Sequence, residues 1–166
     1  MRERDTIELS ISEIAARAGV SRQALYLHYR DRNQLLIDAA VGLFTREFID
    51  GFEVPGQSML DDTVLLTRHF DTNRDFYGVL LGGPCTYELN RQLFLLLQPF
   101  NAEAVRFLLG PDVDDDLVAS LSEFLTGGFG QLINSWVVSR DPERLGSEEF
   151  ARHLTRVLGA LAHSHN

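Results

Sequence analysis

Residues 10–36 read SISEIAARAGVSRQALYLHYRDRNQLL, and this stretch decides the fold of the N-terminal part of the chain. Ser10 and Glu13 have the spacing of a capping box, which predicts that a helix begins there. Gly19 can adopt the left-handed backbone of a tight turn, and Ser21 can cap a second short helix. Two short helices joined by a glycine turn predict a helix-turn-helix.

Small and apolar residues in this stretch fit two helices that cross at a steep angle. Ala15 is small enough to let the helices approach each other, and Leu25 can fill the wedge between them. The first turn of the second helix offers Arg22 and Gln23, at the place where a recognition helix reaches base edges in the major groove. The stretch therefore predicts binding to double-stranded DNA.

Charge is distributed unevenly along the chain. The 166 residues carry a net charge of −9, which by itself disfavours nucleic-acid binding. Residues 14–37, however, hold four arginines and one aspartate, a local charge of +3. Residues 51–166 hold eight arginines and sixteen acidic residues, a local charge of −8. The only concentration of positive charge thus coincides with the predicted helix-turn-helix.

Several classes of protein are disfavoured by composition. Cys85 is the single cysteine, so an internal disulfide is impossible and a reducing compartment fits. No window approaches the roughly 20 apolar residues that span a bilayer, and the charged start MRERDTIELS lacks a signal-peptide core. No cluster of further metal-ligating residues accompanies His163 and His165 in the sequence. We expect a cytoplasmic protein without a membrane span, metal, cofactor or catalytic site.

Helical periodicity dominates, so we expect an all-α fold with two domains: a helix-turn-helix domain over 1–48 and a larger helical domain over 49–166. After a linker at 50–58, helices are expected at about 59–71, 73–82, 86–109, 115–137 and 147–163. Pro99 should kink or split the third of these. The last two should form an antiparallel pair, and two such pairs a homodimer, with close approach allowed by Gly127, Gly128 and Gly130.

Aromatic residues between 59 and 110 suggest a pocket for a small-molecule effector. The candidate lining is Phe70, Phe76, Tyr77, Tyr87 and Phe94. Plain core packing of these side chains is an equally good interpretation, and the sequence does not identify the effector.

The run SISEIAARAGVSRQALYLHYRDRNQLL resembles the DNA-binding domain of the tetracycline-repressor (TetR) family. The resemblance implies a homodimer, an operator with two-fold symmetry, and repression released by a small molecule. It places Ser10, Ser21 and Arg32 at phosphates, Arg22 and Gln23 at base edges, and Tyr26 and His28 at backbone or bases. The serines could also act as caps alone, and Tyr26 and His28 could be packing residues.

One departure from the family concerns the start of the chain. Domains of this type open with a full helix before the turn helix, whereas here only Met1 to Asp5 precede Thr6 and Ile7. We expect that an N-terminal piece is missing. The alternative function is therefore a dimeric ligand-binding or interaction module that has lost DNA binding.

Overall fold

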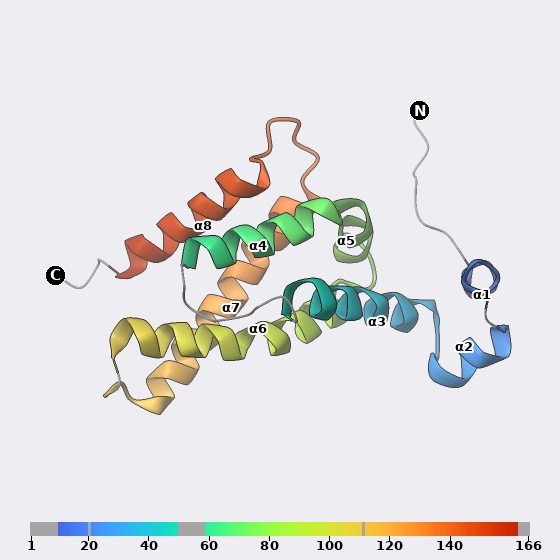
Figure 1. Ribbon diagram of the computed structural model, residues 1–166, viewed down its shortest axis with the longest axis horizontal. Helices are drawn as coiled ribbons and strands as arrows, with labels where there is room; N and C mark the ends of the chain where they lie inside the picture. Colours follow the sequence, from blue (N-terminus) through green and yellow to red (C-terminus); the bar gives the residue numbers. More distant parts are fainter. Residues whose placement is uncertain (1–9, 20, 50–58, 111, 163–166) are drawn as a thin grey trace.

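The computed structural model describes residues 10–19, 21–49, 59–110 and 112–162 (Figure 1). The predicted linker, the residues expected before the first helix, and His163 and His165 lie outside the described residues. All regular elements of the described part are helical, so the all-α prediction is confirmed. The elements are α1 (Ile11–Ala18), α2 (Arg22–His28), α3 (Arg32–Phe44), the π-helical turn η1 (Thr45–Ile49), α4 (Met59–Thr72), α5 (Arg74–Leu81), α6 (Thr86–Leu109), α7 (Asp115–Val138) and α8 (Ser147–Ala162).

The core lies where α3 and η1 meet the helices that follow them. Phe44 on α3 is fully buried, and its ring lies 5.0 Å from that of Phe48 and 5.8 Å from that of Phe70. The ring of Tyr77, also fully buried, lies 4.8 Å from Phe70. The second half of α3 therefore belongs to the core of the larger helical body, although the same helix follows directly after the helix-turn-helix.

The long helices of the body pair differently from the prediction. α8 lies along α4 and α7 packs on α6 (Figure 1). The buried hydroxyl of Thr67 on α4 donates to the backbone oxygen of Ser147 at the start of α8, 3.0 Å away. The expected antiparallel pair of α7 and α8 is thus wrong, because each helix buries its apolar face against an earlier helix.

Contact between α7 and α8 is concentrated near the loop that joins them. The Trp136 ring stacks on Phe150 with 4.5 Å between centroids, and its Nε1 donates to the Leu145 backbone oxygen at 2.8 Å. The Arg144 guanidinium lies 4.4 Å from the Trp136 ring and binds Asp71 on α4 at 2.7 Å. This loop is therefore held to both α7 and α4.

Pro99 does not split α6, which continues from Thr86 to Leu109. A proline inside a helix deprives the carbonyl of the residue four positions earlier of its donor. Here that residue is Leu95, and both Leu95 and Pro99 are exposed, so water can reach the carbonyl. At the other end of the chain α3 ends at Phe44, because the next turn, Thr45–Ile49, adopts the π-helical form of η1.

Candidate nucleic-acid interface

The first helix begins and ends as the sequence pattern predicts. The Ser10 backbone N–H donates to Glu13 Oε2 at 2.7 Å, and the Glu13 N–H donates to Ser10 Oγ at 3.3 Å, which completes the capping box. Gly19 ends α1 with a φ of 68°, a left-handed conformation that favours glycine. These local contacts fix the angle at which the chain leaves α1.

The second helix packs on the first through few side chains and exposes most of its surface. Ser21 Oγ accepts a hydrogen bond from the Ala24 N–H at 3.1 Å and so caps α2. Ala24 and Leu25 are half-buried, Ala15 on α1 is buried, and α2 has no fully buried residue. Ala24 and Leu25 are therefore the partly covered residues of α2, while its other residues are exposed within the described part of the chain.

Six of the seven predicted DNA-contact residues are exposed in the structure. They are Ser10, Ser21, Arg22, Gln23, Tyr26 and His28, and α2 supplies the last four. Tyr26 is 52% exposed and is not a packing residue within this chain. Leu27 beside it is 78% exposed, an apolar side chain that could meet a thymine methyl group. Figure 1 places α1 and α2 at one end of the molecule, joined to the body through α3.

Arg32, the seventh residue, is half-buried at the start of α3. Asp31 caps this helix by accepting from the Gln34 N–H at 3.0 Å, while the Arg30 N–H donates to Gln34 Oε1 at 3.0 Å. The Asp-x-x-Gln spacing is the signal for the Asp31 cap, with the Gln34 side chain reaching back to Arg30, and the sequence interpretation missed it. It holds Arg32 in the first turn, next to the exit of α2.

The start of α3 also lies near the body. Burial raises the pKa of the Cys85 thiol, and the Arg32 guanidinium partly opposes that effect. Both the burial of Cys85 and the direction of its pKa shift disfavour the nucleophilic thiolate. Arg32 consequently stands close to both the helix-turn-helix and the first residues of α6.

Comparison with known proteins agrees with this geometry. Residues 1–39 match the family model of bacterial regulatory proteins of the tetR family. The N-terminal part of the chain is therefore similar to tetR-family regulatory proteins. The match covers α1, α2 and the first half of α3, the part that carries the capped turn and the exposed second helix.

A solved structure resembles this chain over nearly its whole length. It is the dihydroxyacetone kinase operon activator DhaS, with a TM-score of 0.67 and 15% sequence identity, and the alignment covers 96% of this chain and 87% of the other. At that identity the likeness shows the fold alone. Comparison with curated proteins by sequence finds no match. Among the described helices, none is long and apolar enough to cross a membrane.

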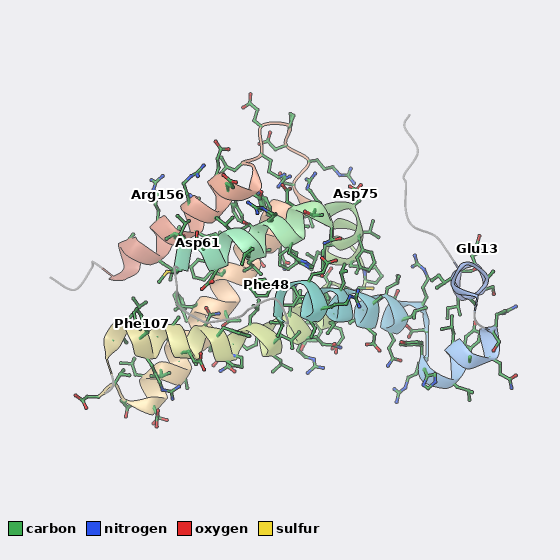
Figure 2. All side chains as sticks on the ribbon, viewed as in Figure 1. Glu13, Phe48, Asp61, Asp75, Phe107 and Arg156 are labelled. Atoms are coloured by element: carbon green, nitrogen blue, oxygen red, sulfur yellow. The ribbon has the colours of Figure 1, made fainter. Side chains whose placement is uncertain are left out.

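The body of the protein contains a cavity of about 460 Å³ between α4, α6, α7 and α8. Its described lining residues are Phe48, Met59, Asp62, Thr63, Leu66, Leu97, Phe100, Asn101, Glu103, Ala104, Phe107, Leu108, Leu125, Thr126, Phe129, Gly130, Ile133, Leu154 and Leu158. Phe107 lies near the C-terminal end of α6 (Figure 2). The volume is that of a site for a small molecule.

None of the five predicted effector-binding residues is among those that line this cavity. Phe70 and Tyr77 are buried in the core, and Tyr87 is 79% exposed. Phe76 and Phe94 are half-buried elsewhere on α5 and α6. Aromatic content alone did not locate this cavity, since most of these rings fill the core or face solvent, and the effector role of the five residues stays a prediction. Polar residues interrupting apolar helix faces, such as Asn101 and Thr126, were the available signal.

A network of polar contacts crosses the core between α3 and the body. The Tyr77 hydroxyl donates to the Ala40 backbone oxygen at 3.0 Å and lies 2.9 Å from His69 Nε2. His69 Nδ1 lies 3.1 Å from Glu47 Oε2 on η1, and Asn73 Nδ2 donates to the same carboxylate oxygen at 3.2 Å. Burial lowers the pKa of His69, and Glu47 opposes that shift. This network of polar contacts thus joins α4 and α5 to α3 and η1.

Proposed function

We propose that this protein is a DNA-binding transcriptional regulator in which α2 reads the major groove of an operator. The observation that carries the proposal is the exposed first turn of α2, where Arg22 and Gln23 follow directly on the Ser21 cap. Arginine and glutamine are the side chains that most often bind guanine and adenine edges in bidentate fashion. The turn is capped and exposed, as DNA reading requires. We therefore favour DNA binding over the alternative function, a ligand-binding or interaction module that has lost DNA binding.

We further propose a homodimer that presents two copies of α2 to successive major grooves. Support comes from α7, which keeps a row of exposed apolar residues although its other side packs on α6. The row is Leu117, Phe124, Leu132 and Val138. Gly127 and Gly128 in the same helix are exposed, and a Cβ there would meet nothing in this chain, so a partner helix can approach closely. α8 completes the proposed interface.

The domain division proposed for such a regulator is 1–48 for DNA and 49–166 for the effector and the partner subunit. The cavity between α4, α6, α7 and α8 is the proposed effector site. Phe48 supports a link between the two parts, because it lines the cavity and belongs to η1, the continuation of α3. A molecule in the cavity would press on this turn, and α3 would pass the displacement to α2.

We propose that the protein is a repressor that its effector releases from DNA. Repression is the direction of regulation that the family resemblance implies. One observation favours activation instead: the structure it resembles is named an operon activator. A reporter gene behind the operator distinguishes the two, since deletion of the regulator raises expression for a repressor and lowers it for an activator.

The experiment that tests the function itself is selection of bound sequences from a random duplex library by the purified protein. We expect enrichment of one sequence with two inverted half-sites about 10 base pairs apart, centre to centre. Absence of any enriched sequence would contradict the proposal. Enrichment of a single half-site without symmetry would contradict only the dimer.

A further inference from the structure

Two hydrogen bonds in series lie in the wall of the cavity between α4, α6, α7 and α8. Asn101 Nδ2 on α6 donates to Thr126 Oγ1 on α7 at 2.8 Å, and the Thr126 hydroxyl donates to the Ser122 backbone oxygen at 2.6 Å. Asn101 and Thr126 both line the cavity, and Thr126 is buried. The cavity therefore has one ordered polar point in a wall that is otherwise mostly apolar.

The direction of these bonds fixes the orientation of the Asn101 amide. A backbone carbonyl can only accept, so the single hydroxyl proton of Thr126 is used by Ser122. Thr126 Oγ1 can then bind Asn101 only as an acceptor, and only the NH2 end of the amide can donate. Asn101 Oδ1 consequently lies at the end of the amide away from Thr126, and no residue of the described part donates to it.

Asn101 Oδ1 is an acceptor that another molecule can reach. Among the described residues, the fully buried side-chain atoms without a hydrogen-bond partner are His69 Nδ1 and Arg144 Nη1. Asn101 is half-buried and its oxygen is not one of these atoms, so the oxygen keeps accessible surface. A ligand that covers this oxygen without donating to it loses about tenfold in affinity, because the oxygen then exchanges water for no partner.

The charged and polar neighbours of Asn101 favour a neutral ligand. None of the described lining residues is a lysine, arginine or histidine, so a buried anion would lose its hydration without gaining a counter-ion. A cation gains little more, because Asp62 already has an interaction within the chain and Glu103 is exposed, where water screens its charge. The Thr63 hydroxyl donates to the Met59 backbone oxygen at 2.7 Å and offers a ligand only its lone pairs.

We propose that this cavity binds a neutral lipophile that donates one hydrogen bond, from a hydroxyl or an N–H group, to Asn101 Oδ1. The proposal rests on the proposed function, because it names the chemical class of the effector. Apolar side chains from all four helices bind the body of the ligand. Asn101 selects the donor, and Thr126 is a positioning residue that holds the amide with its oxygen available. A ligand hydroxyl can also accept from the second N–H of the same amide.

Four naphthalene derivatives test the class, because they share one apolar body and differ in a single group. They are 2-naphthol, which is neutral at pH 7, its methyl ether 2-methoxynaphthalene, the anion 2-naphthoate and the cation naphthalen-2-ylmethylammonium. Isothermal titration calorimetry on the full chain should show 2-naphthol binding at least about fivefold tighter than the ether, which cannot donate. It should also bind tighter than either ion. Equal affinities for naphthol and ether overturn the donor requirement, and tighter binding of an ion overturns the neutral class.

The naphthol-to-ether affinity ratio assigns the selection to Asn101. Asn101→Leu has a similar volume and no acceptor, so its ratio should fall to about one while ether binding is retained. Asn134→Leu makes the same change at a half-buried position of α7 outside the cavity wall and should keep the parent ratio. Retention of the parent ratio in folded Asn101→Leu overturns the role of Asn101.

Two variants of Thr126 test its positioning role by the same ratio. Thr126→Val removes the acceptor that holds the amide, so the ratio should fall about two- to fivefold. Thr126→Ser keeps the hydroxyl and should keep the ratio. A loss of overall affinity with an unchanged ratio in Thr126→Val would show a structural role only and overturn the positioning role.

A cavity-filling variant locates the binding site, and a DNA assay separates the two proposals. A Cβ at Gly130 meets no atom within 4 Å, so Gly130→Leu can enter the cavity and should abolish naphthol binding with unchanged helical circular dichroism. Unchanged binding in this variant, or no binding of any derivative to the parent protein, overturns the site. The ligand-free protein is assayed in parallel for selection of operator DNA. Operator binding without naphthol binding overturns this inference alone, and naphthol binding without operator binding overturns the proposed DNA function alone.

Discussion

The phenolic hydroxyl of Tyr77 donates a hydrogen bond to the backbone oxygen of Ala40, 3.0 Å away, and both residues are fully buried. Ala40 lies on α3, the helix that follows the exposed α2, and Tyr77 lies on α5 in the body. The contact therefore ties α3, the helix that follows the exposed α2, to the body that contains the cavity. His69 lies on the other side of the same hydroxyl.

Removing this hydroxyl should destabilise the protein. Tyr77→Phe leaves His69 Nε2 and the second lone pair of the Ala40 oxygen without their buried partner, which costs about 1–3 kcal/mol. Urea unfolding followed by circular dichroism measures the loss. Tyr87→Phe removes the same hydroxyl from an exposed ring and should change stability by less than about 0.5 kcal/mol. Equal stability of the two variants would contradict the proposed importance of the buried contact.

Stability should also decline on acidification because of His69. Its pKa is lowered by burial, so between that pKa and the ordinary value of 6.5 the unfolded chain binds a proton that the folded chain does not. The contribution of His69 to the free energy of unfolding is thus fully present above pH 6.5. It is lost as the pH falls toward the pKa of His69 in the folded protein. Urea unfolding at pH 7.5, 6.5 and 5.5 measures the slope of the free energy of unfolding against pH.

The matched variants for this pH dependence are His69→Gln and His153→Gln. His153 is exposed on α8, so its replacement should leave the slope of the parent protein intact. His69→Gln should flatten the slope between pH 6.5 and 5.5. If both variants keep the parent slope, His69 is not the responsible group.

The proposed dimer depends on the exposed face of α7. Phe124 is 65% exposed, and Phe124→Glu would place a charge in the centre of the proposed interface. Sedimentation at micromolar concentration should then give a monomer mass, whereas the parent protein gives a dimer. Leu65 on α4 is 48% exposed outside that face, and Leu65→Glu should remain a dimer. A monomeric parent protein would contradict the interface.

Helix limits were predictable from the sequence because they depend on local chemistry. Ser10 and Ser21 cap helices within three residues, and Gly19 supplies the one backbone conformation that other residues adopt rarely. The helices expected at 59–71, 73–82 and 86–109 are confirmed to within one residue at each end as α4, α5 and α6. The similarity of residues 1–39 to tetR-family proteins was predictable from the same local pattern.

The packing of the helices was not predictable in this way. Apolar periodicity indicates which face of a helix is buried but not which helix covers it, so α8 was paired with α7 although it packs on α4. Thr67 and Ser147 meet across 80 residues of sequence. The cavity was not predictable for the same reason, since its wall comes from helices distant in the chain and is completed by Phe48.

Arg32 should position the protein on DNA without reading its sequence. If its guanidinium neutralises one phosphate, Arg32→Ala should weaken binding to all duplexes about equally and reduce the slope of log affinity against log salt by roughly one unit. Fluorescence anisotropy from 50 to 300 mM salt measures the slope. Circular dichroism is recorded for the variant, because Arg32 is half-buried at the start of α3. A selective loss for the selected operator would assign Arg32 to base reading instead.

The central claim, that α2 reads base edges through its first turn, is tested most directly by the discrimination ratio of Arg22→Ala. The ratio is the affinity for the selected operator divided by that for a scrambled duplex of equal length, at fixed salt. The account predicts that Arg22→Ala lowers operator affinity by about 1–3 kcal/mol, leaves scrambled-duplex affinity nearly unchanged, and so reduces the ratio by about tenfold or more. An unchanged ratio, with both affinities falling together, would contradict it.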